Sequence, residues 1–168
     1  RARMTEATAR FALPLLVAGQ AQKEIFHNEA LAAIDGALHP CVEGAPLAEP
    51  PPSPFVGQVW IVSAEAGGDW AGQSDSLAVW TSGGWRFVAP VPGLLAWNKI
   101  SGVWMRWTGA VWSEGTLPAT ALVIGGQQVV GPRLQEVPSP SGGTIIDAEA
   151  RAAIDGLIAT LKSHGLTD

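Results

Sequence analysis

All eight tryptophans of the 168-residue chain lie between Trp60 and Trp112, and the segments on either side contain none. Around them, short runs of Val, Ile and Trp alternate with other residues, which is the pattern of β-strands. Two runs, 77–80 and 85–88, flank the Gly-rich segment 81–84, and such a segment between aromatic runs indicates a hairpin. This distribution predicts a small antiparallel β domain over residues 57–115.

The tryptophans also recur at a shift of 27 residues. Trp80 corresponds to Trp107 and Trp85 to Trp112, and each pair flanks a four-residue turn. We therefore expect the two indoles of a pair to meet across neighbouring strands, where an aromatic pair contributes about 0.2 to 1 kcal/mol. The further correspondences at this shift are Gly57 with Gly84, Trp60 with Phe87, Trp70 with Trp97, Leu77 with Trp104 and Thr81 with Thr108.

The flanking segments carry two helix patterns with narrow stripes. Residues 20–40 are rich in Ala and Leu, and Pro40 ends the pattern. Their N-terminal stripe consists of Gln20, His27, Leu31, Ile34 and Leu38. Residues 144–168 begin with Thr144 or Asp147 as a cap and end near Gly165. Their C-terminal stripe consists of Ala150, Ile154, Leu157 and Leu161. Stripes this narrow suit self-association or docking in a groove, although a solvated face is the alternative for the polar positions of the first helix.

These patterns predict the α+β class, with a helix on each side of a Trp-rich antiparallel hairpin domain. The expected segments are an N-terminal arm (1–19), a helix that serves as anchor and trimer seam (20–40), a Pro-rich connector (41–56), the β domain (57–115), a Gly/Pro-rich linker (116–143) and a C-terminal helix (144–168). Arg1, Ala2 and Arg3 precede Met4 and are left out of this prediction, as a vector remnant or an over-extended start.

Composition argues against several classes of protein. The net charge of −5 comes with no basic stripe, so we expect no nucleic-acid partner. Cys41 is the single cysteine and the three histidines are scattered, which argues against a disulfide, a metal site or a cofactor. No apolar run reaches the ~20 residues that a membrane span requires. With no signal-peptide pattern at the N-terminus, we expect a soluble protein that is not inserted in a membrane.

The Trp cluster admits two interpretations. Indoles stack on the apolar faces of sugar rings, so the cluster could be a carbohydrate-binding surface. Trp85 and Trp112 are then the first contact candidates, with Asp69, Asp75 or Asn98 accepting hydrogen bonds from sugar hydroxyls. Alternatively the indoles fill a core that is poor in Leu and Ile. Because strand residues alternate between faces, we expect one to three exposed indoles.

Catalysis finds little support in the sequence. Glycoside hydrolysis requires two facing carboxylates, and Glu65, Asp69 and Asp75 are available beside Trp70. These acids lie in a Gly-rich stretch, where solvated loop carboxylates are the commoner occurrence. No nucleophile elbow, phosphate loop or zinc-protease motif is present, so we do not expect an enzyme.

Several motifs resemble the opening of a family of phage-tail domains that has no assigned activity. They are Leu13-Pro14-Leu15-Leu16, Gly19-Gln20-Ala21-Gln22-Lys23-Glu24, His27-Asn28-Glu29-Ala30-Leu31 and Asp35. Members occur in tail fibres of alphaproteobacterial phages and gene transfer agents. The likeness covers residues 11–113, and residues 130–166 resemble a closing module of related virion proteins.

This resemblance implies a homotrimeric component of the virion tail, assembled in the cytoplasm of the bacterial host. Its partners would be further copies of itself and the baseplate or other virion proteins, and it would contribute to host attachment. The alternatives are a carbohydrate-binding module, or a head spike, that contacts host polysaccharide through exposed tryptophans.

Overall fold

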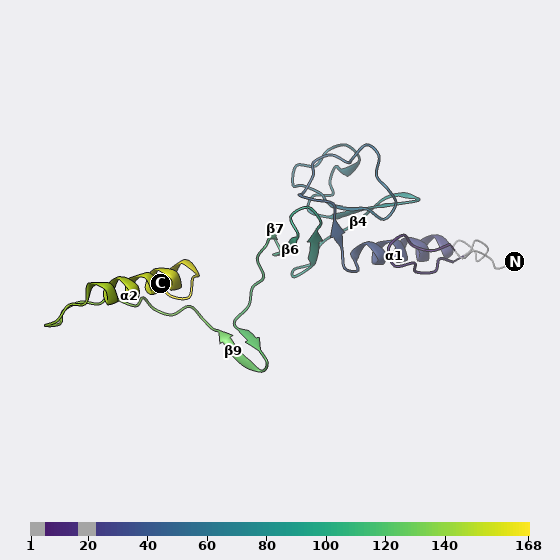
Figure 1. The fold of residues 1–168 in the computed structure, drawn as a ribbon. Helices are drawn as coiled ribbons and strands as arrows, with labels where there is room; N and C mark the ends of the chain where they lie inside the picture. Colours follow the sequence, from purple (N-terminus) through teal and green to yellow (C-terminus); the bar gives the residue numbers. More distant parts are fainter. Residues whose placement is uncertain (1–5, 17–22) are drawn as a thin grey trace. The chain divides into compact units, whose positions relative to one another are not determined.

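The computed structural model describes residues 6–16 and 23–168. It confirms the mixed α+β class: these residues form a seven-stranded sheet, a separate two-stranded hairpin and two α-helices. The chain divides into two compact units, Arg1–Leu117 and Pro118–Asp168, and the sheet lies in the first (Figure 1).

The sheet of the first unit is built symmetrically around a two-residue central strand, β1. Its strand order is β4-β3-β2-β1-β5-β6-β7. The strands are β1 (Cys41–Val42), β2 (Val59–Ile61), β3 (Leu77–Thr81), β4 (Gly84–Val88), β5 (Leu95–Asn98), β6 (Val103–Trp107) and β7 (Trp112–Glu114). β1 runs parallel to both β2 and β5, whereas every other pairing is antiparallel.

The prediction of a purely antiparallel domain is therefore wrong at its centre. Residues 41–56, which the sequence presents as a connector, contribute β1. Val42 is fully buried and its carbonyl accepts from Lys99 N, while Glu43 N donates to Val59 O. A two-residue strand is too short to show alternation, so its pattern could not be read among the prolines that follow.

The two predicted hairpins are confirmed, and they share one turn design. Trp80 pairs with Trp85, with ring centroids 4.8 Å apart, and Trp107 pairs with Trp112 at 5.7 Å. Thr81 Oγ1 donates to Gly84 O at 2.7 Å, and Thr108 Oγ1 donates to Val111 O at 2.9 Å. The 27-residue repeat thus describes β3–β4 and β6–β7.

The repeat does not extend beyond these hairpins. Trp70 ends the 3₁₀ helix η1 (Gly68–Trp70), whereas its counterpart Trp97 lies within β5. The reason is the connection between β2 and β3, which holds η1, while β5 and β6 are joined by a short turn without such an insertion.

Both faces of the sheet carry a hydrophobic core, and this decides where the tryptophans lie. The first core contains Val42, Val59, Ile61, Leu77, Val79, Ala96 and Met105, with Trp112 packed against it. The second contains Trp60, Val62, Trp70 and Ala78, with Trp80 and Trp85 packed against it. The two cross-strand Trp pairs of the hairpins therefore lie on opposite faces.

The sheet curls around the first core. Trp112 Nε1, on the edge strand β7, donates at 2.8 Å to the carbonyl oxygen of Asp75, which precedes β3. β3 and β7 lie on opposite sides of β1. This hydrogen bond therefore joins the two halves of the sheet across its concave face.

The helix α1 (Lys23–Ala37) contacts β3 and β4, as seen in Figure 1. A short N-terminal arm fastens it. Asp35, which is buried, accepts hydrogen bonds from Thr8 Oγ1, Arg10 N and Phe11 N. The Arg10 guanidinium donates to the carbonyl oxygens of Asp35, Gly36, Leu38 and His39. Arg10 therefore caps the C-terminal end of α1, where a positive charge is favourable.

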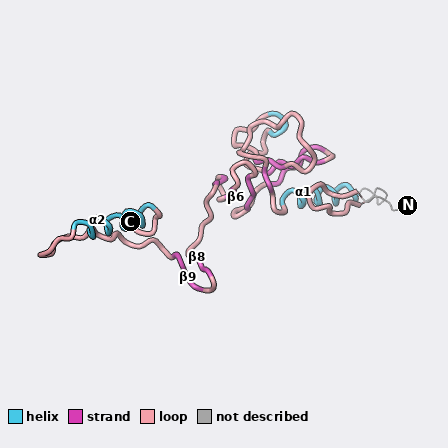
Figure 2. The backbone as a smooth tube through the Cα atoms, in the orientation of Figure 1, coloured by secondary structure: helices cyan, strands magenta, loops and turns pink. Residues whose placement is uncertain are grey.

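The second unit contains the hairpin of β8 (Leu122–Ile124) and β9 (Gln127–Val130) and the helix α2 (Ala148–Ser163), joined by a long loop (Figure 2). Asp147 is the N-cap of α2, since its Oδ1 accepts from Ala150 N at 2.8 Å. The loop runs alongside α2. Leu134 forms a β-bridge with Thr167, and the Arg151 side chain donates to the carbonyls of Pro140 and Gly142. Lys162 Nζ lies 2.5 Å from Glu136 Oε1. Its hydrogen bond and its charge hold the pKa of Glu136 below the usual value.

Candidate functional site

The two indoles proposed as sugar contacts are packed inside the first unit. The Trp85 ring lies 5.1 Å from Trp70 and 5.6 Å from Trp60, edge to face. Trp112 packs on the first core, and its Nε1–H donates a hydrogen bond to the carbonyl oxygen of Asp75. All eight tryptophans lie in the described residues, and each is buried or half-buried, so the expectation of exposed indoles is wrong. In the β3–β4 hairpin, Trp80 and Trp85 alternate away from the first core and pack against the second.

The acidic candidates are not gathered into one site. Asp69 is exposed on η1, and Glu65 is exposed in the preceding loop. Asp75 is half-buried and meets Trp112 through its main-chain carbonyl, with a φ of 65°. The main-chain carbonyl of Asp75 therefore helps to hold the curl of the sheet, whereas its carboxylate makes no hydrogen bond with Trp112.

The N-terminal stripe stays uncovered within the described residues. Ile34 is 51% exposed and Leu38 is 45% exposed. His27 is exposed as well, and Leu31 is half-buried. Gln20 lies outside the described residues. The helix turns a different side toward the sheet: a Cβ added to Gly36 would lie 2.3 Å from Val79 Cγ2, so the backbone of α1 approaches the sheet closely at this glycine.

The acidic residues of α1 between Glu24 and Ala37 all turn toward the rest of the unit. Asp35 binds the arm, and Glu29 binds Arg86. Glu24 is half-buried, and its Oε2 is buried without a partner among the described residues. The outward side therefore carries Phe26, His27, Ala30 and Ile34, all exposed. A helix face without charged residues is typical of a surface that another protein covers.

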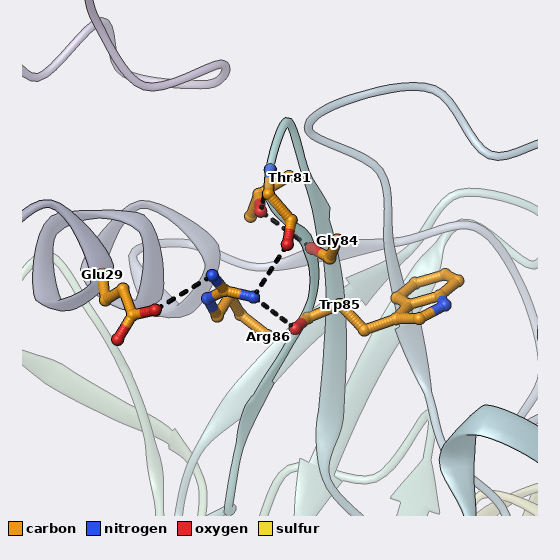
Figure 3. Close-up of polar contacts among 6 residues, drawn as sticks. Glu29, Thr81, Gly84, Trp85 and Arg86 are labelled. Carbon is orange, nitrogen blue, oxygen red and sulfur yellow. Dashed lines mark hydrogen bonds and ion pairs between the residues drawn. The ribbon is translucent and has the colours of Figure 1, made fainter. Parts of the chain in front are cut away.

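Arg86 fastens α1 to the β3–β4 hairpin. It donates to Glu29 Oε1 at 3.1 Å, to Gly83 O at 3.2 Å and to Trp85 O at 2.9 Å (Figure 3). Beside it lies a cleft of about 410 Å³ between the arm, α1 and the hairpin. The polar groups of the cleft are largely engaged by the protein itself: Asn28 exchanges hydrogen bonds with the backbone of Leu16, and Asp35 holds the arm. The ion pair has a structural role here.

The C-terminal stripe is exposed in full. Ile154 is 44% exposed and Leu157 is 66% exposed, and Ala150 and Leu161 are exposed as well. In residues 118–168 the buried side chains are Ile158 and Thr167. In β8, all three residues are exposed although all are apolar. A two-stranded hairpin is at best marginally stable in water, and a unit this small needs a core or an external surface. The second unit therefore lacks the core that would stabilise it alone.

Within residues 6–16 and 23–168, no helix has the length and apolar character required to cross a bilayer. In the same residues, no group of three His, Cys, Asp or Glu side chains is placed to hold a metal ion.

The comparison with protein families gives one match. The family described as "Protein of unknown function (DUF2793)" matches residues 27–113, just over half of the chain. The chain belongs to this DUF2793 family. The matched stretch begins inside α1 and contains nearly the whole seven-stranded sheet, whereas the arm and the second unit lie outside it. No curated protein matches the chain.

Proposed function

We propose that this DUF2793 protein is a non-enzymatic structural component of a phage or gene-transfer-agent tail, which forms homotrimers and links the baseplate to host-recognition parts. The observation that carries the proposal is the exposure of both apolar stripes, together with the missing core of the second unit. Apolar surface that one chain leaves in water favours association by about 25 cal/mol for each Å² buried. A symmetric assembly covers the same stripe on every copy.

The virion setting rests on the resemblance of residues 11–113 to phage-tail domains and of residues 130–166 to a closing module of related virion proteins. An assembly in the host cytoplasm and a place on the virion tail belong to the same proposal. The anchor would be α1, whose uncharged outer side suits a baseplate or a sister copy. Electron microscopy of particles labelled with an antibody against this chain tests the location, and label on heads alone contradicts it.

Sedimentation of the full chain tests the self-association. We expect a trimer at micromolar concentration, and we expect Ile34→Asp or Leu157→Asp to shift the mass toward the monomer, because each buries a charge in its stripe. Ile100→Asp is the matched control, since Ile100 is 80% exposed and lies outside both stripes. A wild-type protein that sediments as a monomer would contradict the proposed self-association.

A further inference from the structure

One indole pair lies outside both hydrophobic cores. Trp97 on β5 faces Trp104 on β6, with ring centroids 5.2 Å apart and planes at 77°. Both residues are half-buried. Trp60, Trp70 and Trp107 are buried, and Trp80, Trp85 and Trp112 pack against a core. Since Ala96 and Met105 enter the first core, alternation places Trp97 and Trp104 on the opposite, convex face of the sheet.

Arg106 lies on the same face, two residues after Trp104. It is half-buried and directly opposite Leu95. Its Nε is buried without a hydrogen-bond partner among the described residues. The other four arginines of the described residues, Arg10, Arg86, Arg133 and Arg151, each donate to a carbonyl or a carboxylate. The terminal Nη groups of the guanidinium are not among the buried atoms without a partner, and no described residue accepts a hydrogen bond from them. They are therefore the donors that an acceptor from outside the chain can reach.

Trp97, Trp104 and Arg106, which share this face of β5 and β6, are called the aromatic face. Of these three residues, Trp104 also lines a shallow depression of about 450 Å³. Leu95, His39 and Pro40 are among its other lining residues. Its volume is within the range of sites for small ligands, which combine mostly apolar walls with a few polar groups.

We infer that the aromatic face binds a sugar residue that carries a carboxylate. The face of an indole stacks on the C–H face of a pyranose ring, and a guanidinium pairs with a carboxylate through charge-assisted hydrogen bonds. The chain has a net charge of −5 and so repels a polyanion at long range. Binding of an acidic polysaccharide therefore requires a local site, which Arg106 supplies. This inference goes beyond the proposed structural role and does not depend on it.

Retardation of the full chain in native gels that contain polygalacturonate tests the inference, with dextran as the neutral polymer. We expect retardation by polygalacturonate and little by dextran. Arg106→Gln should weaken the apparent affinity by about tenfold, because it removes the charge, whereas Arg106→Lys should retain part of it. Trp104→Ala should abolish binding. Lys99→Gln is the matched control, because Lys99 is a partly exposed cation that already binds Glu43.

Three outcomes would overturn the inference: no retardation of the wild type, equal retardation by both polymers, or an Arg106→Gln protein that binds like the wild type. Sedimentation of the same samples separates this result from the assembly proposal. A trimer that does not bind polygalacturonate would contradict only the sugar site. A monomer that binds polygalacturonate would contradict only the proposed trimer. Dichroism spectra that match the wild type show that each variant is folded.

Discussion

Gly36 sets the distance between α1 and the sheet. A Cβ at this position would lie 2.3 Å from Val79 Cγ2, closer than two non-bonded carbons approach. Val79 is 2% exposed and belongs to the first core, so it has no free space to move into. The glycine is therefore required by packing, in spite of its low helix propensity.

The replacement Gly36→Ala is expected to lower the free energy of unfolding of the first unit by about 1 to 3 kcal/mol, the usual cost of overpacking. Chemical denaturation followed by Trp fluorescence measures it, since every Trp lies in this unit. Gly156→Ala is the matched control: nothing lies within 4 Å of its added Cβ, so it should raise the helicity of α2. An unchanged stability of Gly36→Ala would mean that α1 does not pack as described.

Asp35 and Arg10 could not be paired from the sequence. They are 25 residues apart, and only the fold of the arm brings the backbone N–H of Arg10 to within 2.9 Å of Asp35 Oδ2. The sequence does offer one signal, an acidic residue on the same side of the helix as Asn28 and Ala32. Because the sequence does not show which residue Asp35 binds, this signal fits a solvated carboxylate as well as a buried one that holds the N-terminal arm.

One side chain connects the edge strand β7 to the opposite half of the sheet. Trp112 packs on the first core, and its Nε1–H reaches across the concave face to Asp75 O. The hairpin signal predicts that Trp112 meets Trp107, which the structure confirms. The curl that brings Asp75 within 2.8 Å depends on the twist of all seven strands, which no local pattern encodes.

We expect Trp112→Phe to destabilise the first unit by about 1 to 3 kcal/mol, because it removes the hydrogen bond and leaves the Asp75 carbonyl without this donor. Trp104→Phe removes the same atoms from a half-buried indole outside the cores and should cost less. Thermal unfolding of the two variants provides the comparison. Equal losses would show that the Asp75 contact adds nothing to the burial of the ring.

The two units differ in how they are stabilised. The first has a core on each face of its sheet, whereas the second buries Ile158 and Thr167 alone. The first unit therefore has the packing of an independent domain. The second requires a surface from elsewhere to offset the entropy of ordering its chain.

Calorimetry of the full chain should accordingly show two transitions. The transition of the second unit should move to higher temperature as protein concentration rises, because association stabilises by mass action. The transition of the first unit should move less, because its two cores stabilise it without association. Leu157→Asp should remove the concentration dependence of the second unit. Two transitions that are both independent of concentration would contradict a role of the second unit in association.

The sequence by itself determined the hairpins and their cross-strand Trp pairs, and it limited the cap of α2 to Thr144 or Asp147, because each depends on residues within a few positions of one another. The Gly125-Gly126 pair, at which both φ values are positive, is a local signal for the turn between β8 and β9. The prediction of a linker over residues 116–143 does not include this hairpin. Tertiary structure alone decided that β1 occupies the centre of the sheet, that the arm locks onto Asp35, and that each Trp lies against a core or on the convex face. These features depend on contacts between distant segments, and a strand pattern with period two states that side chains alternate without stating what covers either face.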